Sequence, residues 1–157
     1  MPLDPTLHAD DLRTWHGSMP VASRYTLGPA GERFFRAMKD EARILGTRCG
    51  RCNLTYVPGK LFCERCFDEL TDWIEVGPSG TVEAVTVVHL DLDGTLLDPP
   101  LLMALVRLDG ADTVLYHRLS GVDAADANIG LRVEAAFRPA EDRTGSILDI
   151  AHFRPLG

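Results

Sequence analysis

The stretch that decides the fold is RCGRCNLTYVPGKLFCERC, residues 48–66. It holds every cysteine of the chain, in the pattern Cys49-x2-Cys52-x10-Cys63-x2-Cys66. Each CxxC pair makes a tight turn whose two thiolates converge on one ion, and two such turns joined by a short hairpin complete a tetrahedron. The spacing therefore predicts a structural metal site, because four thiolates leave no coordination position open for a substrate.

The metal that this ligand set favours is one zinc ion, although iron held as in rubredoxin stays open. Redox-active dithiols and local disulfides are the other interpretations of paired CxxC motifs. A unit this small cannot fold on its own apolar core, so the binding energy of the ion becomes folding energy. If all four cysteines bind metal, no thiol is left as a catalytic nucleophile.

The composition around this stretch is that of a soluble globular protein. The chain has 157 residues, 45% of them hydrophobic and 25% charged, with a formal net charge of −7. No apolar run approaches the length of about 18 residues that a membrane-spanning helix needs. Residues 1–11 lack the basic and apolar segments of a secretory signal. Clustered rather than dispersed cysteines indicate a reducing compartment, so we expect a cytoplasmic protein without a membrane partner.

Upstream of the cysteines, residues 1–29 read as a polar N-terminal arm and residues 30–46 as a helix that stops at Gly46. Phe34, Phe35 and Met38 fall on one face of this helix. Two interpretations stay open for that face. It packs on the chain's own core, or it contacts a partner chain or an acyl group.

Downstream, the pattern changes to strands. We expect them at residues 81–90, 101–108, 113–119, 131–138 and 146–153, with a helical turn in residues 122–130. Five strands with a helical insertion after the third are typical of a closed OB-fold barrel. The predicted fold is therefore mainly β: an N-terminal helical segment, a rubredoxin-like zinc ribbon over residues 47–75, and a C-terminal five-stranded OB-fold barrel over residues 76–157.

Residues 91–98, DLDGTLLD, match the first motif of haloacid-dehalogenase-type phosphatases. That chemistry also needs a doubly wound parallel sheet and a cation for the phosphate, usually lysine. No lysine follows Asp91, and no strand–helix alternation follows it either. The alternative is a hairpin loop in which Asp93-Gly94 makes a tight turn, and we expect that one.

Nucleic acid is the usual partner of zinc ribbons and OB barrels, but the charge argues against it here. Residues 76–157 hold six basic and twelve acidic side chains. A groove that follows a phosphate backbone needs a positive surface with stacking aromatics, and this segment has only three aromatic residues. We therefore expect no nucleic-acid partner.

Several further motifs accompany the cysteine quartet. They are Phe34-Phe35 in the helix, Tyr56-Val57-Pro58, Trp73-Ile74-Glu75-Val76, Gly80-Thr81-Val82, Leu105-Val106-Arg107-Leu108-Asp109, Ile129-Gly130-Leu131-Arg132-Val133 and Phe153-Arg154-Pro155. Together, over about residues 30–155, they resemble the zinc-ribbon/OB-fold family catalogued as domain of unknown function 35. The chain departs from that family in the acidic loop of residues 91–100 and in its unmatched N-terminal arm.

This resemblance implies an accessory role in acyl-CoA chemistry. Members of the family look like partners of thiolase-fold enzymes, among them thiolases, aldolases of sterol side-chain breakdown and acyltransferases. The expectation is a non-catalytic subunit of a two-component acyl-CoA thiolase, forming a hetero-oligomer and binding a CoA thioester within it. A stand-alone acyl-CoA-binding module, or a partner of an aldolase or acyltransferase, is the alternative. The cations flanking the cysteines are candidates for CoA phosphate or partner contact, namely Arg48, Arg51, Lys60 and Arg65.

Overall fold

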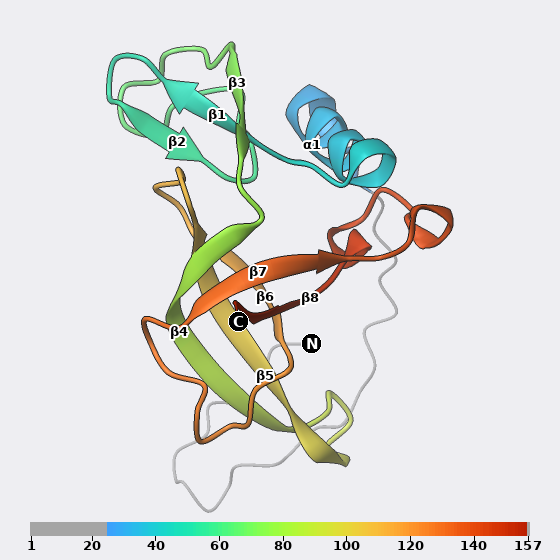
Figure 1. The fold of residues 1–157 in the computed structure, drawn as a ribbon. Helices are drawn as coiled ribbons and strands as arrows, with labels where there is room; N and C mark the ends of the chain where they lie inside the picture. The colour runs from blue at the N-terminus through green and yellow to red at the C-terminus, as the bar shows by residue number, and fades with distance from the viewer. Residues whose placement is uncertain (1–24, 157) are drawn as a thin grey trace, which may run out of the picture.

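The computed structural model describes residues 25–156, so most of the predicted N-terminal arm lies outside the described residues. One helix, a small sheet and a barrel follow each other along the chain (Figure 1). The helix is α1 (Gly28–Glu41), and the small sheet has the order β2-β1-β3, with β1 (Ile44–Cys49), β2 (Leu54–Tyr56) and β3 (Asp72–Val76). Within residues 25–156 no helix combines the length and apolar character needed to cross a membrane.

The barrel confirms the predicted five-stranded OB-type architecture. It closes in the order β4-β5-β6-β8-β7, with β4 (Ser79–Leu90), β5 (Leu96–Leu108), β6 (Leu115–Leu119), β7 (Arg132–Phe137) and β8 (Ile150–Pro155). All neighbouring strands are antiparallel except β6 and β8. Alternating inward side chains of these strands, such as Val82, Val106 and Phe153, are fully buried and form the core.

The two longest strands, β4 and β5, form a hairpin that reaches beyond the barrel. Its tip lies at the opposite end of the molecule from the three-stranded sheet (Figure 1). Asp91 and Asp93 accept backbone hydrogen bonds inside the turn, from Leu92 and Thr95 respectively. Because Asp91 joins two antiparallel strands and does not end a parallel one, the hairpin interpretation holds and the phosphatase one is excluded.

Helix α1 begins with proline in its first turn, as expected, but ends at Glu41, five residues before the predicted end at residue 46. Ala42 caps the helix in the left-handed conformation, with φ of 53°. Gly46, the expected stop, instead lies in β1. A Cβ atom there would approach the Tyr56 carbonyl oxygen to 2.8 Å, so this glycine is required by sheet packing and not by a helix end.

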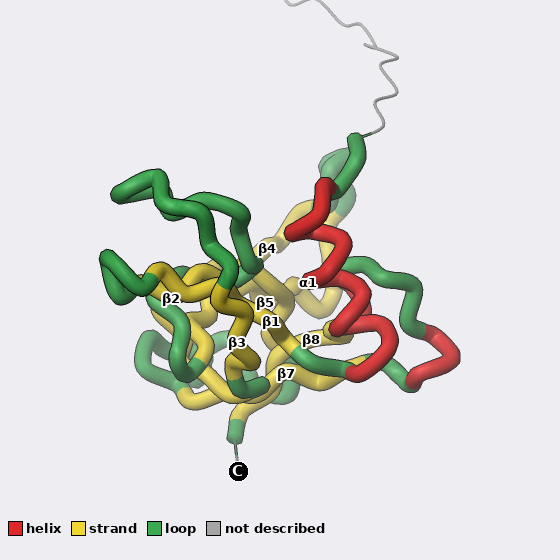
Figure 2. The backbone as a smooth tube through the Cα atoms, turned by 90° about the horizontal axis from the view of Figure 1, so that it is seen from above, coloured by secondary structure: helices red, strands yellow, loops and turns green. Residues whose placement is uncertain are grey.

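The helical turn expected within residues 122–130 is present: the Asp126 and Ala127 N–H groups both donate to the Asp123 carbonyl at 3.0 Å. The prediction for the start of the last strand is wrong. The first four residues expected in the last strand, 146–149, instead form a 3-10 turn before β8. This turn is closed by a capping box between Ser146 and Asp149. Figure 2 shows its loop running beside α1, and there Arg143 Nη1 donates a 3.0 Å hydrogen bond to the Met38 carbonyl.

The small sheet is fastened to the barrel through the outer edge of β2. The Thr55 N–H donates to the Asp112 carboxylate at 2.8 Å, and the Asp112 N–H donates to the Thr55 carbonyl at 2.9 Å. The Val57 N–H donates to Thr113 Oγ1 at 2.7 Å, and that hydroxyl donates back to the Val57 carbonyl at 2.9 Å. These four bonds, which we call the β2 clasp, occupy a strand edge that would otherwise be open.

Candidate metal centre

The end of β1 and the two cysteine turns bring all four cysteines of the chain together. Their Sγ atoms lie within 4.8 Å of one another, and Cys49 and Cys66 are 3.5 Å apart. A tetrahedral ion with metal–sulfur bonds of ~2.3 Å sets its sulfurs about 3.8 Å apart. Cys49 and Cys63 are buried, whereas Cys52 and Cys66 are half-buried. The four thiols therefore fit a closed metal site, and they are the residues that would hold the ion.

Both CxxC turns have the same backbone construction. The residue that follows the second cysteine of each pair is left-handed, with φ of 54° at Asn53 and 60° at Phe67. The N–H of each donates to the carbonyl of the first cysteine of its pair, at 2.8 and 3.0 Å. Asparagine adopts this conformation readily, but phenylalanine does not, so the second turn carries some backbone strain, which an ion bound between the turns would offset.

One tyrosine supports the centre from inside the sheet. Tyr56 is buried, and its hydroxyl lies 3.2 Å from Cys63 Sγ. This hydrogen bond lowers the pKa of Cys63 to about 6 and, from the other side, raises the pKa of Tyr56 to about 12. The hydroxyl therefore acts as the donor to a thiolate, which is the form of cysteine that binds metal.

We expect Tyr56→Phe to weaken metal binding while leaving the fold unchanged, because it removes only the hydroxyl. Loss of a hydrogen bond to a metal ligand costs about 10- to 100-fold in affinity. Competition with a chromogenic chelator measures this change. Tyr116→Phe, at an exposed position of β6, is the matched control. Equal affinity in Tyr56→Phe and the wild type would show that the hydroxyl does not act on Cys63.

The helix face proposed for partner or acyl contact is not a free surface. Phe34 and Met38 are fully buried and pack with Ile44 and the barrel residue Ile150 in the chain's own core. Phe35 is half-buried, with its ring edge-on to Phe34 at 5.2 Å. Phe34 and Met38 therefore pack on the chain's own core and present no surface to a partner.

The four cations near the cysteines are exposed or half-buried at the surface, and three already have partners within the chain. Arg48 bonds to the Asn53 side chain, and Arg51 lies 3.5 Å from Asp68. Lys60 pairs with Glu64 and sits 5.1 Å above the Tyr56 ring. Arg65 is exposed without an ion pair to any residue the structure describes. Their contact with CoA phosphates stays a prediction.

Sequence reasoning missed an apolar surface on the second cysteine turn. Phe67 is 77% exposed, Phe62 57% and Leu61 40%. We call these three residues the ribbon patch. The sequence could have indicated this surface. Cysteines that bind one ion must point inward, so large apolar residues close to them in the chain are expected to point outward. Exposed patches of this kind mark interaction surfaces.

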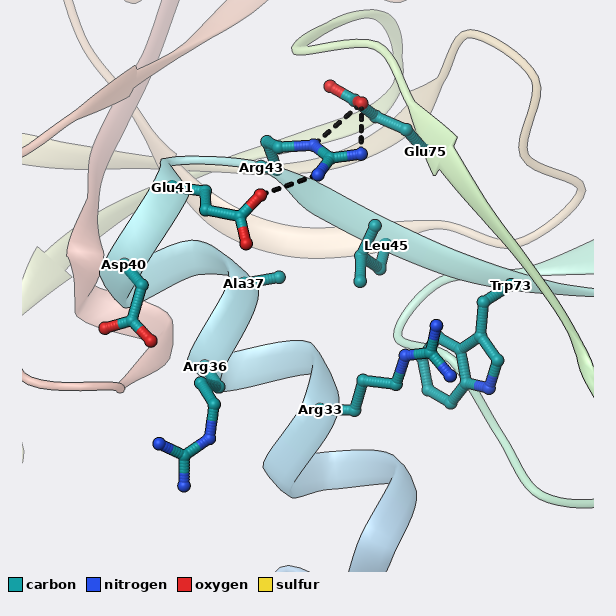
Figure 3. Close-up of a pocket in the computed structure, with 9 residues that line it drawn as sticks. All are labelled: Arg33, Arg36, Ala37, Asp40, Glu41, Arg43, Leu45, Trp73 and Glu75. Carbon is teal, nitrogen blue, oxygen red and sulfur yellow. Dashed lines mark hydrogen bonds and ion pairs between the residues drawn. The ribbon is translucent and has the colours of Figure 1, made fainter.

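A cleft of about 320 Å³ separates α1 from β1 and β3 (Figure 3). Its arginines already have partners within the chain, and Arg36 pairs with Glu32. Arg43 bonds to both Glu41 and Glu75, and Arg33 lies 4.6 Å above the Trp73 ring. The contacts across the cleft hold the helix against the sheet and occupy its arginines, so we assign no ligand to the cleft.

The chain combines a four-cysteine ribbon with a closed OB barrel, and it has no cysteine outside the ribbon. These features define a class of small, two-part β proteins. Residues 73–138 match the family model described as the C-terminal OB-fold domain of ChsH2. A DUF35 domain-containing scaffold protein of Methanocaldococcus jannaschii is 26% identical over 131 residues, which cover 79% of this chain and 89% of that relative.

Two solved structures share the fold. A protein of unknown function from the DUF35 family of Sulfolobus solfataricus has a TM-score of 0.63 and 25% identity, covering 82% of this chain and 84% of the other. The Ltp2-ChsH2(DUF35) aldolase has a TM-score of 0.61 and 24% identity, covering 84% and 98%. The expected resemblance is supported: the chain is similar to DUF35 proteins, and most of its barrel matches the OB-fold domain of ChsH2.

Proposed function

We propose that this chain is a non-catalytic accessory subunit of a thiolase-fold enzyme that acts on CoA thioesters. The observation that carries the proposal is the similarity, over 79% of the chain, to a DUF35 protein described as a scaffold. The site agrees with it, because all four thiols gather in one closed cluster and no cysteine is left as a nucleophile. The partner then supplies the reacting groups, and this chain supplies a shaped and rigid surface.

For the reaction we propose thiolytic cleavage or formation of a β-ketoacyl-CoA. A second candidate is carbon–carbon bond cleavage by an aldolase, which is favoured by the similarity to the DUF35 chain of the Ltp2-ChsH2(DUF35) aldolase. The thiolase and the aldolase reactions require the same role of this subunit. Each needs a partner chain and a CoA thioester bound within the pair.

The metal in this proposal is one zinc ion held by Cys49, Cys52, Cys63 and Cys66. Zinc supplies a cross-link between the two cysteine turns and no catalysis, since a four-thiolate site has no open position. Thiols that must stay reduced fit the cytoplasm, where we place the protein. We also propose that the chain has two domains, a zinc ribbon over residues 47–75 and an OB-fold barrel over residues 76–157.

The ribbon patch is our candidate for the partner contact. Its aromatic residues Phe62 and Phe67 are side chains of the kind that anchor protein interfaces. Arg65, the one cation of the predicted set with neither an ion pair nor a side-chain hydrogen bond among the described residues, lies between them in sequence. An apolar centre with a charged rim is the usual arrangement of such a contact.

The test is affinity purification of the tagged, full-length protein from its own host, with mass spectrometry of the chains that come with it. A thiolase-fold chain in near-equal amount supports the proposal. A protein that purifies alone and binds acyl-CoA by titration supports the stand-alone binding module instead, and one that purifies alone without binding overturns both.

Once the partner is identified, we expect Phe67→Asp to reduce its recovery by about tenfold or more, because a charge replaces an interface anchor. Zinc content should be unchanged, since the side chain points away from the thiols into solvent. The matched control is Ile129→Asp, an equally exposed apolar residue in a barrel loop. If both variants recover the partner as the wild type does, the ribbon patch is not the contact.

A further inference from the structure

A cavity of about 420 Å³ opens on the side of the barrel, between β5, β6, β8 and the loop that precedes β8. Its apolar lining includes the half-buried side chains of Met103, Ile147 and Ala151. The exposed ring of Tyr116 also lines it. The volume falls within the range of pockets that bind small molecules.

His117, Leu148 and two arginines complete the lining, and the two arginines stand out among the cations of the barrel. Residues 76–156 hold six arginines and no lysine. Three form ion pairs: Arg107 with Glu83, Arg132 with Asp109 and Arg154 with Glu134. A fourth, Arg143, donates to a carbonyl of α1. The other two, Arg118 and Arg138, have no ion pair among residues 25–156, and both line this one cavity.

One of the two guanidinium groups is held in place. Arg138 Nε donates a 2.7 Å hydrogen bond to the Leu148 carbonyl, which leaves its terminal nitrogens available. Fixing a guanidinium through Nε reduces the entropy that it loses when it binds an anion. Arg118 projects from β6, the strand that also carries Tyr116.

No group in the cavity competes for these two cations. None of its lining residues is acidic. The nearby carboxylate of Asp149 is buried and already accepts hydrogen bonds from the backbone of its own loop. The imidazole of His117 is used at both nitrogens: Nδ1 accepts from the Arg118 N–H at 2.9 Å, so Nε2 carries the proton and donates to the Ile147 carbonyl at 3.1 Å.

We propose that this cavity binds a small organic anion: a carboxylate or phosphate attached to an apolar or aromatic body. Each guanidinium group can donate two parallel hydrogen bonds to a pair of oxygens on such an anion. The apolar lining and the Tyr116 ring take the body of the ligand. In a barrel segment with twice as many acidic as basic residues, two unpaired arginines at one apolar cavity give it a local charge opposite to that of its surroundings. This site lies apart from the ribbon, and it does not depend on the proposed partner.

The experiment titrates the full-length, metal-loaded protein with phenyl phosphate and benzoate, followed by two-dimensional ¹H–¹⁵N NMR. We expect saturable shifts centred on Tyr116, Arg118 and Ala151. Arg118→Gln and Arg138→Gln should each weaken binding by about tenfold, as expected for losing a charged hydrogen-bond donor. The control Arg107→Gln removes a paired, exposed arginine from the same barrel and should bind as the wild type does.

Three results would overturn the proposal. The first is the absence of saturable shifts up to millimolar ligand. The second is equal weakening in Arg107→Gln, which would indicate attraction to general charge. The third is equal affinity for inorganic phosphate, which would show that the apolar lining takes no part. Circular dichroism of each variant verifies that the barrel is folded, so a loss of binding reports on the cavity itself.

Discussion

Replacing Cys63 by serine is expected to abolish stable zinc binding and to unfold the outer part of the β1–β3 sheet, while the barrel stays folded. The outer part has its own small core of Cys49, Tyr56, Cys63 and Leu70. That core is too small to fold without the binding energy of the ion, which is about 10–16 kcal/mol in small zinc-dependent units. The barrel has a separate and larger set of buried residues, which includes Val82, Val106 and Phe153.

Metal analysis by mass spectrometry should find about one zinc per chain in the wild type and very little in Cys63→Ser. NMR spectra should show residues of the cysteine turns collapsing to unfolded positions while barrel signals persist. Glu64→Gln, an exposed neighbour, is the control and should keep its zinc. A Cys63→Ser protein that retains a full equivalent of zinc would refute the four-thiolate site.

Asp149→Asn is expected to lower the stability of the barrel by about 3 kcal/mol, which for a chain of this length corresponds to a fall of roughly 10 °C in Tm. The Asp149 carboxylate is 1% exposed and accepts from the backbone N–H groups of Thr144, Gly145 and Ser146, at 2.8, 2.8 and 3.3 Å. An asparagine side chain keeps one acceptor oxygen and turns an N–H₂ group toward the remaining donors. Buried donors then lose their partners.

The same residue makes this stability depend on pH. Burial of Asp149 opposes its ionisation, but the three backbone N–H donors outweigh that effect and hold the pKa of the carboxyl below its ordinary value. A carboxyl whose folded-state pKa is lowered stabilises the protein above the unfolded-state value of about 3.9, and this contribution is lost as the pH falls below it. The difference in Tm between wild type and Asp149→Asn should therefore shrink toward pH 3.

Thermal melts at pH 7 and pH 3 measure both effects. Asp142→Asn, an exposed carboxylate in the same loop, is the control and should change Tm little at either pH. A difference between wild type and Asp149→Asn that is as large at pH 3 as at pH 7 would mean that packing, and not charge, accounts for the loss.

The parts of the fold that the sequence predicted are those specified locally. The CxxC spacing brings its own thiolates together, and apolar or β-branched stretches separated by turn residues marked the five barrel strands. The end of α1 was missed because tertiary contacts decide it: Gly46 serves the sheet, and Ala42 takes the left-handed cap. The turn before β8 was missed although Ser146-x-x-Asp149 is a readable capping pattern.

The surfaces were harder to predict than the metal site. The periodicity of α1 shows that Phe34 and Met38 share a face, but it does not tell whether that face meets the chain's own core or another molecule. The sequence does not single out the two arginines of the barrel cavity, because they differ from the other arginines only in having no carboxylate partner. Only the folded chain reveals which arginines are paired and which are not.

The β2 clasp has a mechanical consequence. A linker such as Gly77-Pro78, between a small sheet and a barrel, would ordinarily serve as a hinge, but the bonds of Thr55 and Val57 to Asp112 and Thr113 cross from one part to the other beside it. We therefore expect the small sheet and the barrel to move as one rigid body. The tip of the β4–β5 hairpin, which carries the exposed side chains of Leu92 and Leu96, lies at the other end of that body.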